Sequence, residues 1–136
     1  MRRRLRLLRR LSRAEWRELL VACAWQVRLR TTLVRNRGAV ARLASIARRR
    51  RRIVRYPLRS EDIERLARWS GVLCRGSCLT NAFVHEIIAA RHGLHRPVTI
   101  GVALEGTTLR AHAWAGTDEG ARAFVSVWAD GQDTRP

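Results

Sequence analysis

Hydrophobic positions follow a helical period over most of the chain and change to a strand period near its C-terminal end. Between residues 12 and 92, apolar side chains recur every three to four positions, which is typical of amphipathic helices. From Arg96 onward apolar side chains recur at about every second position, as in half-buried strands. The change of period predicts an α+β fold, with helices first and a small antiparallel sheet after them.

The first predicted helix begins at a capping box, Ser12-Arg-Ala-Glu15, and runs through about Leu29. We expect one apolar face on this helix, which makes Cys23 a small buried hydrophobe. That face consists of Trp16, Leu19, Leu20, Cys23 and Val27. A weaker helical pattern continues from Leu33 to Ala47, past Gly38.

Two further helices are predicted in the middle of the chain. One starts at Ser60, which is expected to cap it, and runs to about Trp69. In the other, Gly76 and Ser77 form a tight loop and Cys78 is the first helical residue. The predicted end of this helix is Gly93. Its apolar positions have helical spacing and are Leu79, Ala82, Phe83, Ile87 and Ala90.

Three strands complete the predicted fold, separated by turns at residues 105–108 and 117–120. We predict strands over 97–104, 109–115 and 121–128, arranged as an antiparallel meander in which the third strand pairs with the second. On the second strand Arg110, His112 and Trp114 share one face, and the alanines between them share the other.

Charge divides the chain into two segments. Residues 1–60 contain 20 arginines and two acids, whereas residues 61–136 contain eight arginines and nine acids. We therefore describe an arginine-rich helical segment, 1–60, and a mixed segment, 61–136, within one compact domain. The run from Arg48 to Arg52 is either a solvated connector or a docking surface for an acidic partner or nucleic acid.

Several classes of protein do not fit the composition. No run of eighteen apolar residues exists, and Arg9, Arg10 and Arg13 interrupt what would be the apolar part of a secretory signal. The three cysteines therefore fit free thiols in a cytoplasmic protein rather than a disulfide framework. No glycine-rich phosphate loop is present, and the five tryptophans are dispersed.

A cysteine and a histidine carry the candidate chemistry. The unpaired N–H groups and the dipole at a helix N-terminus favour the thiolate form of Cys78. His112 lies on a strand that can hold it rigidly, so the two residues could act as nucleophile and base of a cysteine peptidase. The third member would be Asp130, because it closes the third strand, which is predicted to pair with the His112 strand. Asp118 is the alternative, but it lies in the turn, where aspartate is common for backbone reasons. Spacing alone leaves open a structural thiol and an ordinary polar histidine.

A zinc site is the alternative chemistry for the same region. Cys74 and Cys78 are four residues apart, and His85 and His92 follow. A second pair at finger-like spacing is missing, so we expect no metal. We expect His85 to face solvent, and His92 to be favourable at a helix end as a cation.

Three segments resemble those of the bacterial leader peptidases of lasso peptide biosynthesis, which belong to the transglutaminase-like, papain-related cysteine peptidases. They are Gly76-Ser-Cys78-Leu79 at a helix start, Thr99-Ile-Gly-Val102 on a strand, and Arg110-Ala-His112-Ala-Trp114 on the strand after it. The resemblance implies a transglutaminase-like core and a triad of Cys78, His112 and an aspartate. Ala115-Gly116 departs from the family's Val-Glu, which keeps the choice between Asp118 and Asp130 open.

The resemblance also implies substrates and partners. The chain is similar to the stand-alone form of the peptidase, which removes the leader from a ribosomally made precursor. A separate leader-binding protein and an ATP-dependent, macrolactam-forming cyclase would be its partners, and no cofactor is implied. The alternative is an arginine-rich nucleic-acid-binding or scaffold protein without catalytic activity, in which residues 1–60 are the active part.

Overall fold

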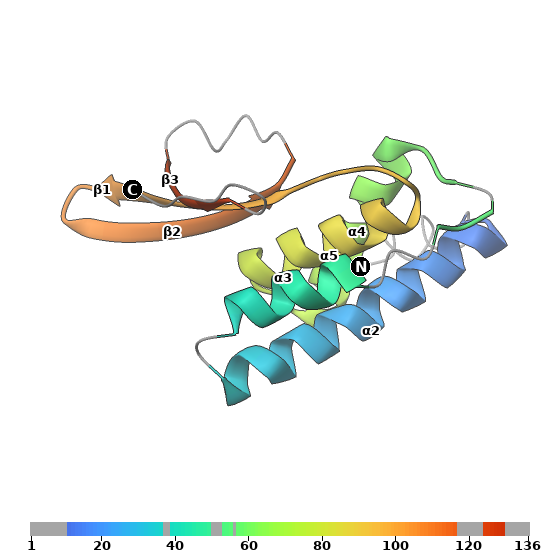
Figure 1. Ribbon diagram of the computed structural model, residues 1–136, viewed down its shortest axis with the longest axis horizontal. Helices are drawn as coiled ribbons and strands as arrows, with labels where there is room; N and C mark the ends of the chain where they lie inside the picture. The colour runs from blue at the N-terminus through green and yellow to red at the C-terminus, as the bar shows by residue number, and fades with distance from the viewer. Residues whose placement is uncertain (1–10, 37–38, 50–52, 56, 117–123, 130–136) are drawn as a thin grey trace, which may run out of the picture.

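Within the part of the chain that the structure describes, four helices and a three-stranded antiparallel sheet form an α+β fold, with the sheet on one side of the helices (Figure 1). The computed structural model describes residues 11–36, 39–49, 53–55, 57–116 and 124–129 of the chain. The helices are α2 (Arg13–Arg35), α3 (Val40–Arg49), α4 (Ser60–Cys74) and α5 (Cys78–Arg91). The strands are β1 (Val98–Glu105), β2 (Thr108–Ala115) and β3 (Val125–Ala129).

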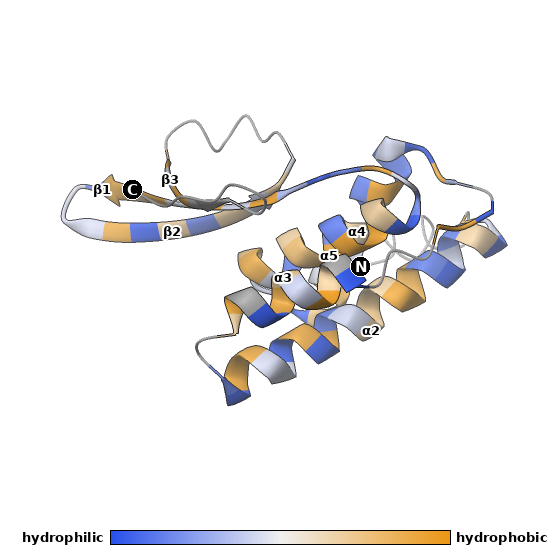
Figure 2. Ribbon diagram, viewed as in Figure 1, coloured by the Kyte–Doolittle hydropathy of each residue, from blue (hydrophilic) through white to orange (hydrophobic). Residues whose placement is uncertain are grey.

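The predicted capping box begins α2. The Glu15 N–H donates to Ser12 Oγ at 3.2 Å, and the Ser12 N–H donates to Glu15 Oε2 at 2.8 Å. Each side chain thus satisfies a backbone donor of the other residue. The helix continues to Arg35, beyond the predicted end at Leu29, and hydrophobic and hydrophilic residues alternate along it (Figure 2).

The predicted apolar face of α2 was wrong. Leu19 is buried, but Leu20 and Val27 are 64% and 57% exposed. The buried face is Glu18, Leu19, Ala22, Trp25, Gln26 and Leu29. It includes two polar residues, Glu18 and Gln26, which find hydrogen-bond partners inside the protein. Buried polar groups with partners are tolerated, so hydropathy alone placed the face on the wrong side.

One hydrophobic core joins the arginine-rich segment to the rest of the chain. Leu29 of α2 and Leu43 of α3 belong to the same buried cluster as Phe83 and Ile87 of α5 and Val98 of β1. All five side chains are 1% exposed or less. The helices of segment 1–60 therefore pack directly on the helix that begins at Cys78.

The ends of α4 differ in detail from the prediction. Arg59, not Ser60, occupies the N-cap position, and Ser60 Oγ instead accepts a 2.7 Å hydrogen bond from Arg96. The helix continues past Trp69 to Cys74, and Arg75 ends it in the left-handed conformation, with φ 52°. A short loop then leads directly into α5.

The sheet has the order β2-β1-β3, so the predicted meander was wrong. β1 pairs with both neighbours, and Gly101 lies opposite His112 of β2 and Ser126 of β3. The segment between Ala115 and Val125 is longer than the about two to five residues of a tight hairpin, so it can return the chain to the far side of β1. The apolar strand β1 is therefore the central strand of the sheet, and the more polar β2 is an edge strand.

Candidate active site

Cys78 is the first residue of α5, as the sequence predicts. Ser77 is the N-cap, and its Oγ accepts a 3.2 Å hydrogen bond from the Thr80 N–H. The Cys78 side chain is exposed, next to the positive end of the helix dipole. Its thiol is therefore accessible to a substrate.

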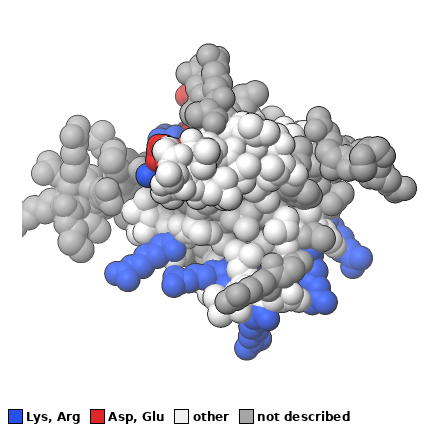
Figure 3. All heavy atoms as spheres, turned by 90° about the vertical axis from the view of Figure 1, so that its left-hand side faces the viewer, with Lys and Arg blue, Asp and Glu red and all other residues white. Residues whose placement is uncertain are grey.

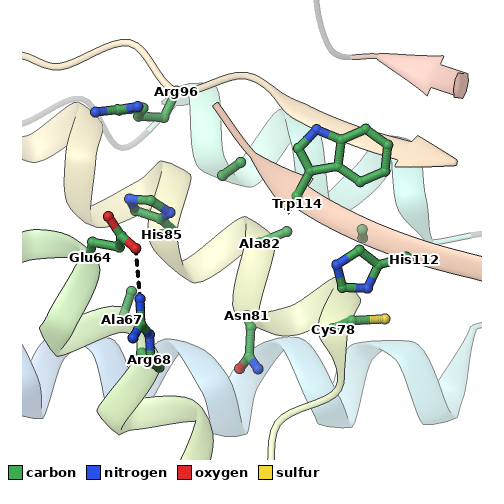
Figure 4. Close-up of a pocket in the computed structure, with 12 residues that line it drawn as sticks. Glu64, Ala67, Arg68, Cys78, Asn81, Ala82, His85, Arg96, His112 and Trp114 are labelled. Carbon is green, nitrogen blue, oxygen red and sulfur yellow. Dashed lines mark hydrogen bonds and ion pairs between the residues drawn. The ribbon is translucent and has the colours of Figure 1, made fainter. Parts of the chain in front are cut away.

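A cavity of about 590 Å³ extends from Cys78 along α5, between α4 and β2 (Figure 4). Cys78, Asn81, Ala82 and His85 of α5 line it at helical spacing. Glu64, Ala67 and Arg68 of α4, His112 to Ala115 of β2, and Arg96 complete the lining. This volume lies within the range of ordinary ligand pockets.

His112 lies beside Cys78 at one end of this cavity (Figure 4). Its ring is flanked by two aromatic rings, with centroids 6.0 Å away for Trp114 and 5.4 Å away for Phe124. These rings hold the imidazole at the edge of the sheet. The structure thus brings together the cysteine and the histidine that the sequence identified, although 34 positions separate them.

Gly101 leaves room for this aromatic group. A Cβ at Gly101 would lie 2.8 Å from Cη2 of Trp114 and 2.9 Å from Cβ of Phe124, closer than carbon atoms approach. Any other residue at Gly101 would push the rings that flank His112 out of place. The Ile-Gly-Val motif of the central strand therefore has a steric reason.

The proposed third members of the triad, Asp118 and Asp130, lie outside the described residues. The sequence argument for Asp130 assumed that the third strand pairs with the His112 strand. In the structure β1 lies between them. That argument no longer favours Asp130 over Asp118.

The opposite end of the cavity is basic. Arg68 pairs with Glu64 at 2.7 Å, and Arg96 lies across the same end, above His85 (Figure 4). His85 is half-buried and lines the cavity, so the expectation that it faces solvent was wrong. Burial lowers the pKa of His85, and the charges of Arg96 and Arg68 lower it further against the opposing effect of Glu64.

Beneath the Cys78 end, two side-chain amides meet. Gln26 Nε2 of α2 donates a 2.6 Å hydrogen bond to Asn81 Oδ1 of α5. A Cβ at Gly71 would lie 2.2 Å from Asn81 Oδ1, and one at Gly76 would lie 2.5 Å from both Asn81 Oδ1 and Gln26 Oε1. The two glycines therefore allow this amide pair to support the loop that carries Cys78.

The remaining cysteines are placed differently from Cys78. Cys74 is half-buried and its Sγ lies 3.9 Å from the Cys23 carbonyl oxygen. Burial, followed by the neighbouring Cys74 thiol, raises the pKa of Cys23 to about 12. Cys23 is thus a poor nucleophile. Over the described residues, no three histidine, cysteine or acidic side chains come together to hold a metal ion.

A second ionic cluster lies away from the cavity and connects α2 to the end of α5. Arg91 donates two 3.0 Å hydrogen bonds to the carboxylate of Glu18, which is 3% exposed. His92, expected as a cation at a helix end, is buried instead. Its Nδ1 accepts from the Leu58 N–H at 2.9 Å, and its Nε2 lies 3.6 Å from Glu18 Oε2.

Sequence reasoning missed four residues around the site: Gln26, Asn81, Arg96 and Phe124. Asn81 had an available signal, because it is one turn after Cys78 on the same helix. The other three come from α2, the loop before β1 and the residue before β3. No local pattern in the sequence connects those segments to the cysteine helix.

Comparisons with protein-family models, with curated proteins and with solved structures found no match for this chain. No helix within the described ranges is long and apolar enough to cross a membrane.

Proposed function

We propose that the chain is a cysteine peptidase with Cys78 as nucleophile and His112 as general base. One observation carries the proposal: a thiol at the N-terminus of a helix and an imidazole on an edge strand lie side by side in one cavity (Figure 4). Nucleophilic catalysis by cysteine requires this pairing within reach of a substrate.

The chemistry requires these two side chains and backbone donors. His112 takes the thiol proton, the Cys78 thiolate attacks the scissile carbonyl, and His112 returns the proton to the leaving amine, which leaves an acyl-enzyme thioester. A water molecule, deprotonated by His112, then hydrolyses the thioester and releases the acid product and the free enzyme. The N–H groups at the start of α5, including that of Cys78, stabilise the oxyanion of the tetrahedral intermediate. Asp130 or Asp118 would complete the triad by orienting His112. No cofactor is needed for these steps.

The substrate proposal rests on the resemblance of the Cys78 and His112 motifs to lasso leader peptidases. On this proposal the chain has a transglutaminase-like core and removes the leader from a lasso precursor in the cytoplasm. It works with a separate leader-binding protein, and a macrolactam-forming cyclase acts on the released core. Genes for a short precursor and an asparagine-synthetase-like cyclase are expected beside its own.

Cleavage of the precursor tests this proposal. A lasso precursor peptide is incubated with the leader-binding protein and either the wild type or Cys78→Ala, and the products are identified by mass spectrometry. We expect one cut between leader and core with the wild type and none with the variant. His112→Ala should lose cleavage equally, whereas Cys74→Ala should keep it. Undiminished cleavage by Cys78→Ala would contradict the proposal.

The arginine-rich helices support a second candidate, a nucleic-acid-binding protein. Figure 3 shows arginine side chains gathered along one edge of the face in view. The exposed arginines of α2 and α3 are Arg13, Arg17, Arg28, Arg30, Arg35, Arg42 and Arg49. Binding to a generic DNA duplex should then weaken steeply with salt. Cleavage by the wild type without such binding favours the peptidase.

A further inference from the structure

The basic end of the cavity contains Arg96, which no carboxylate of the described residues neutralises. Among the described residues, Arg68 is paired with Glu64, but Arg96 forms no ion pair. Its only hydrogen bond there is to the neutral Ser60 Oγ, at 2.7 Å. Among the described residues that line this end, one carboxylate accompanies two guanidinium groups, so their summed charge is positive.

The Arg96 side chain is held in place by its surroundings. Gly116 has φ +74°, and a Cβ there would lie 2.8 Å from Cδ and 2.9 Å from Nη1 of Arg96. The Arg96 side chain therefore packs directly against the backbone of Gly116, where any Cβ would collide with it. With Nη2 fixed on Ser60, no described residue accepts from the other N–H groups of Arg96, and these can donate to an acceptor in the cavity.

The distance between the basic end of the cavity and Cys78 can be compared with the length of an extended peptide. Cys78 and His85 are seven residues apart on α5, which corresponds to about 10 Å along the helix axis. An extended peptide advances about 3.3 Å per residue, so about three residues cover this distance. A peptide lying along α5 with its scissile bond at Cys78 would place a side chain near Arg96 at that separation.

We propose that Arg96 is a specificity residue that binds the carboxylate of an aspartate or glutamate about three residues from the scissile bond. This inference rests on the proposed peptidase function, whose substrate class it narrows to peptides with an acidic side chain. A guanidinium binds a carboxylate through two parallel N–H donors, and the site excludes cationic side chains by like charge.

Protection of Cys78 from alkylation tests this inference without requiring cleavage. The probes are two soluble decapeptides of alanine, serine and glycine, one with a single central glutamate and the other with glutamine in its place. Each is titrated against the wild type, and the iodoacetamide alkylation of Cys78 is followed by peptide mass spectrometry. We expect half-protection at about a five- to tenfold lower concentration of the glutamate peptide, in line with a charge-assisted hydrogen bond at a partly exposed site.

Two variants identify the residue responsible. Arg96→Gln should remove the difference between the peptides, and Arg96→Lys should retain part of it. Arg49→Gln, which removes an exposed arginine of α3 outside the cavity, should leave the difference intact. Circular dichroism establishes that each variant is folded. Equal protection by both peptides, or a preference that survives in Arg96→Gln, would overturn the inference.

Failure of this inference is distinguishable from failure of the peptidase proposal. Loss of precursor cleavage in Cys78→Ala, combined with equal protection by the two peptides, would leave a peptidase without an acidic subsite. Precursor cleavage that survives in Cys78→Ala would remove the peptidase proposal, whatever the peptides do.

Discussion

Gln26 Nε2 donates a 2.6 Å hydrogen bond to Asn81 Oδ1, and this bond connects α2 of the arginine-rich segment to the first turns of the cysteine helix. Gln26 is 1% exposed, and its Oε1 has no hydrogen-bond partner among the described residues. Leaving a buried polar atom unpaired costs free energy. The pair is therefore a contact on which the position of the Cys78 loop depends.

Removing either amide should destabilise the protein, and removing both should cost less than the sum. Gln26→Ala leaves Asn81 without its donor and opens a space in the core, so we expect a loss of about 1–3 kcal/mol of unfolding free energy. A double-mutant cycle with Asn81→Ala, followed by urea denaturation, measures the coupling. Additive single-variant losses would show that the bond contributes no coupling.

The aromatic group around His112 predicts a steric effect of Gly101→Ala. The new methyl group collides with Trp114 and Phe124, so we expect a loss of about 1–3 kcal/mol of stability and a changed tryptophan emission spectrum. The matched control is Gly106→Asn. Gly106 has open space around it and φ +60°, which asparagine tolerates. A stable Gly101→Ala variant with unchanged emission would contradict this packing.

Much of the fold follows from local sequence. The capping box at Ser12, the helix start at Cys78 and the change of period near Arg96 each depend on neighbouring residues only, and the structure has all three. Strand order is different in kind. Whether β3 pairs with β1 or β2 depends on contacts between distant segments, such as Phe124 against Trp114. Such contacts leave no periodic signal.

The residues of the candidate site also fall into those that local sequence identifies and those that depend on distant contacts. Cys78 and His112 could be identified because each lies in a recognisable local motif. Arg96 could not, because its position in the cavity depends on the space that Gly116 leaves and on a hydrogen bond to Ser60, 36 positions earlier. Gln26 was hidden because a buried amide and an exposed one look identical in a helical pattern.

The corrected face of α2 gives a prediction from two adjacent leucines. Leu19 is 1% exposed and Leu20 is 64% exposed. Leu19→Ala should cost about 2–5 kcal/mol of unfolding free energy, since it leaves a cavity in the core. Leu20→Ala should change it by less than about 0.5 kcal/mol. Urea denaturation of the two variants distinguishes this face from the one that the sequence predicts, on which both leucines are buried.

Acid should destabilise the protein in two ranges of pH. Burial lowers the pKa of His92 below 6.5, so the unfolded chain binds a proton that the native state does not, and stability falls as pH drops below about 6.5. Burial alone would raise the pKa of Glu18, but the hydrogen bonds and charge of Arg91 outweigh it, and the pKa lies below 4.5. That contribution is present above pH 4.5 and is lost as pH falls further.

Denaturation between pH 8 and pH 4 measures this dependence. His92→Asn keeps an acceptor for the Leu58 N–H but does not titrate, so it should flatten the decline between pH 7 and pH 5. His85 has a lowered pKa too, so His85→Asn should flatten the same range and the double variant more than either. The growing positive charge of the chain affects all variants alike. An unchanged slope in the double variant would rule out these histidines as its cause.

The three thiols should differ in reactivity in an order set by their surroundings. Cys78 is exposed at a helix N-terminus, whereas the pKa of Cys23 is about 12, which leaves about one thiolate in 10⁵ at pH 7. We expect iodoacetamide at pH 7 to alkylate Cys78 first and Cys23 last, as peptide mass spectrometry would show. His112→Ala should slow the alkylation of Cys78 but not that of Cys74, because only Cys78 shares the cavity with the imidazole. Equal rates for Cys78 in the wild type and in His112→Ala would show that the histidine does not activate the thiol.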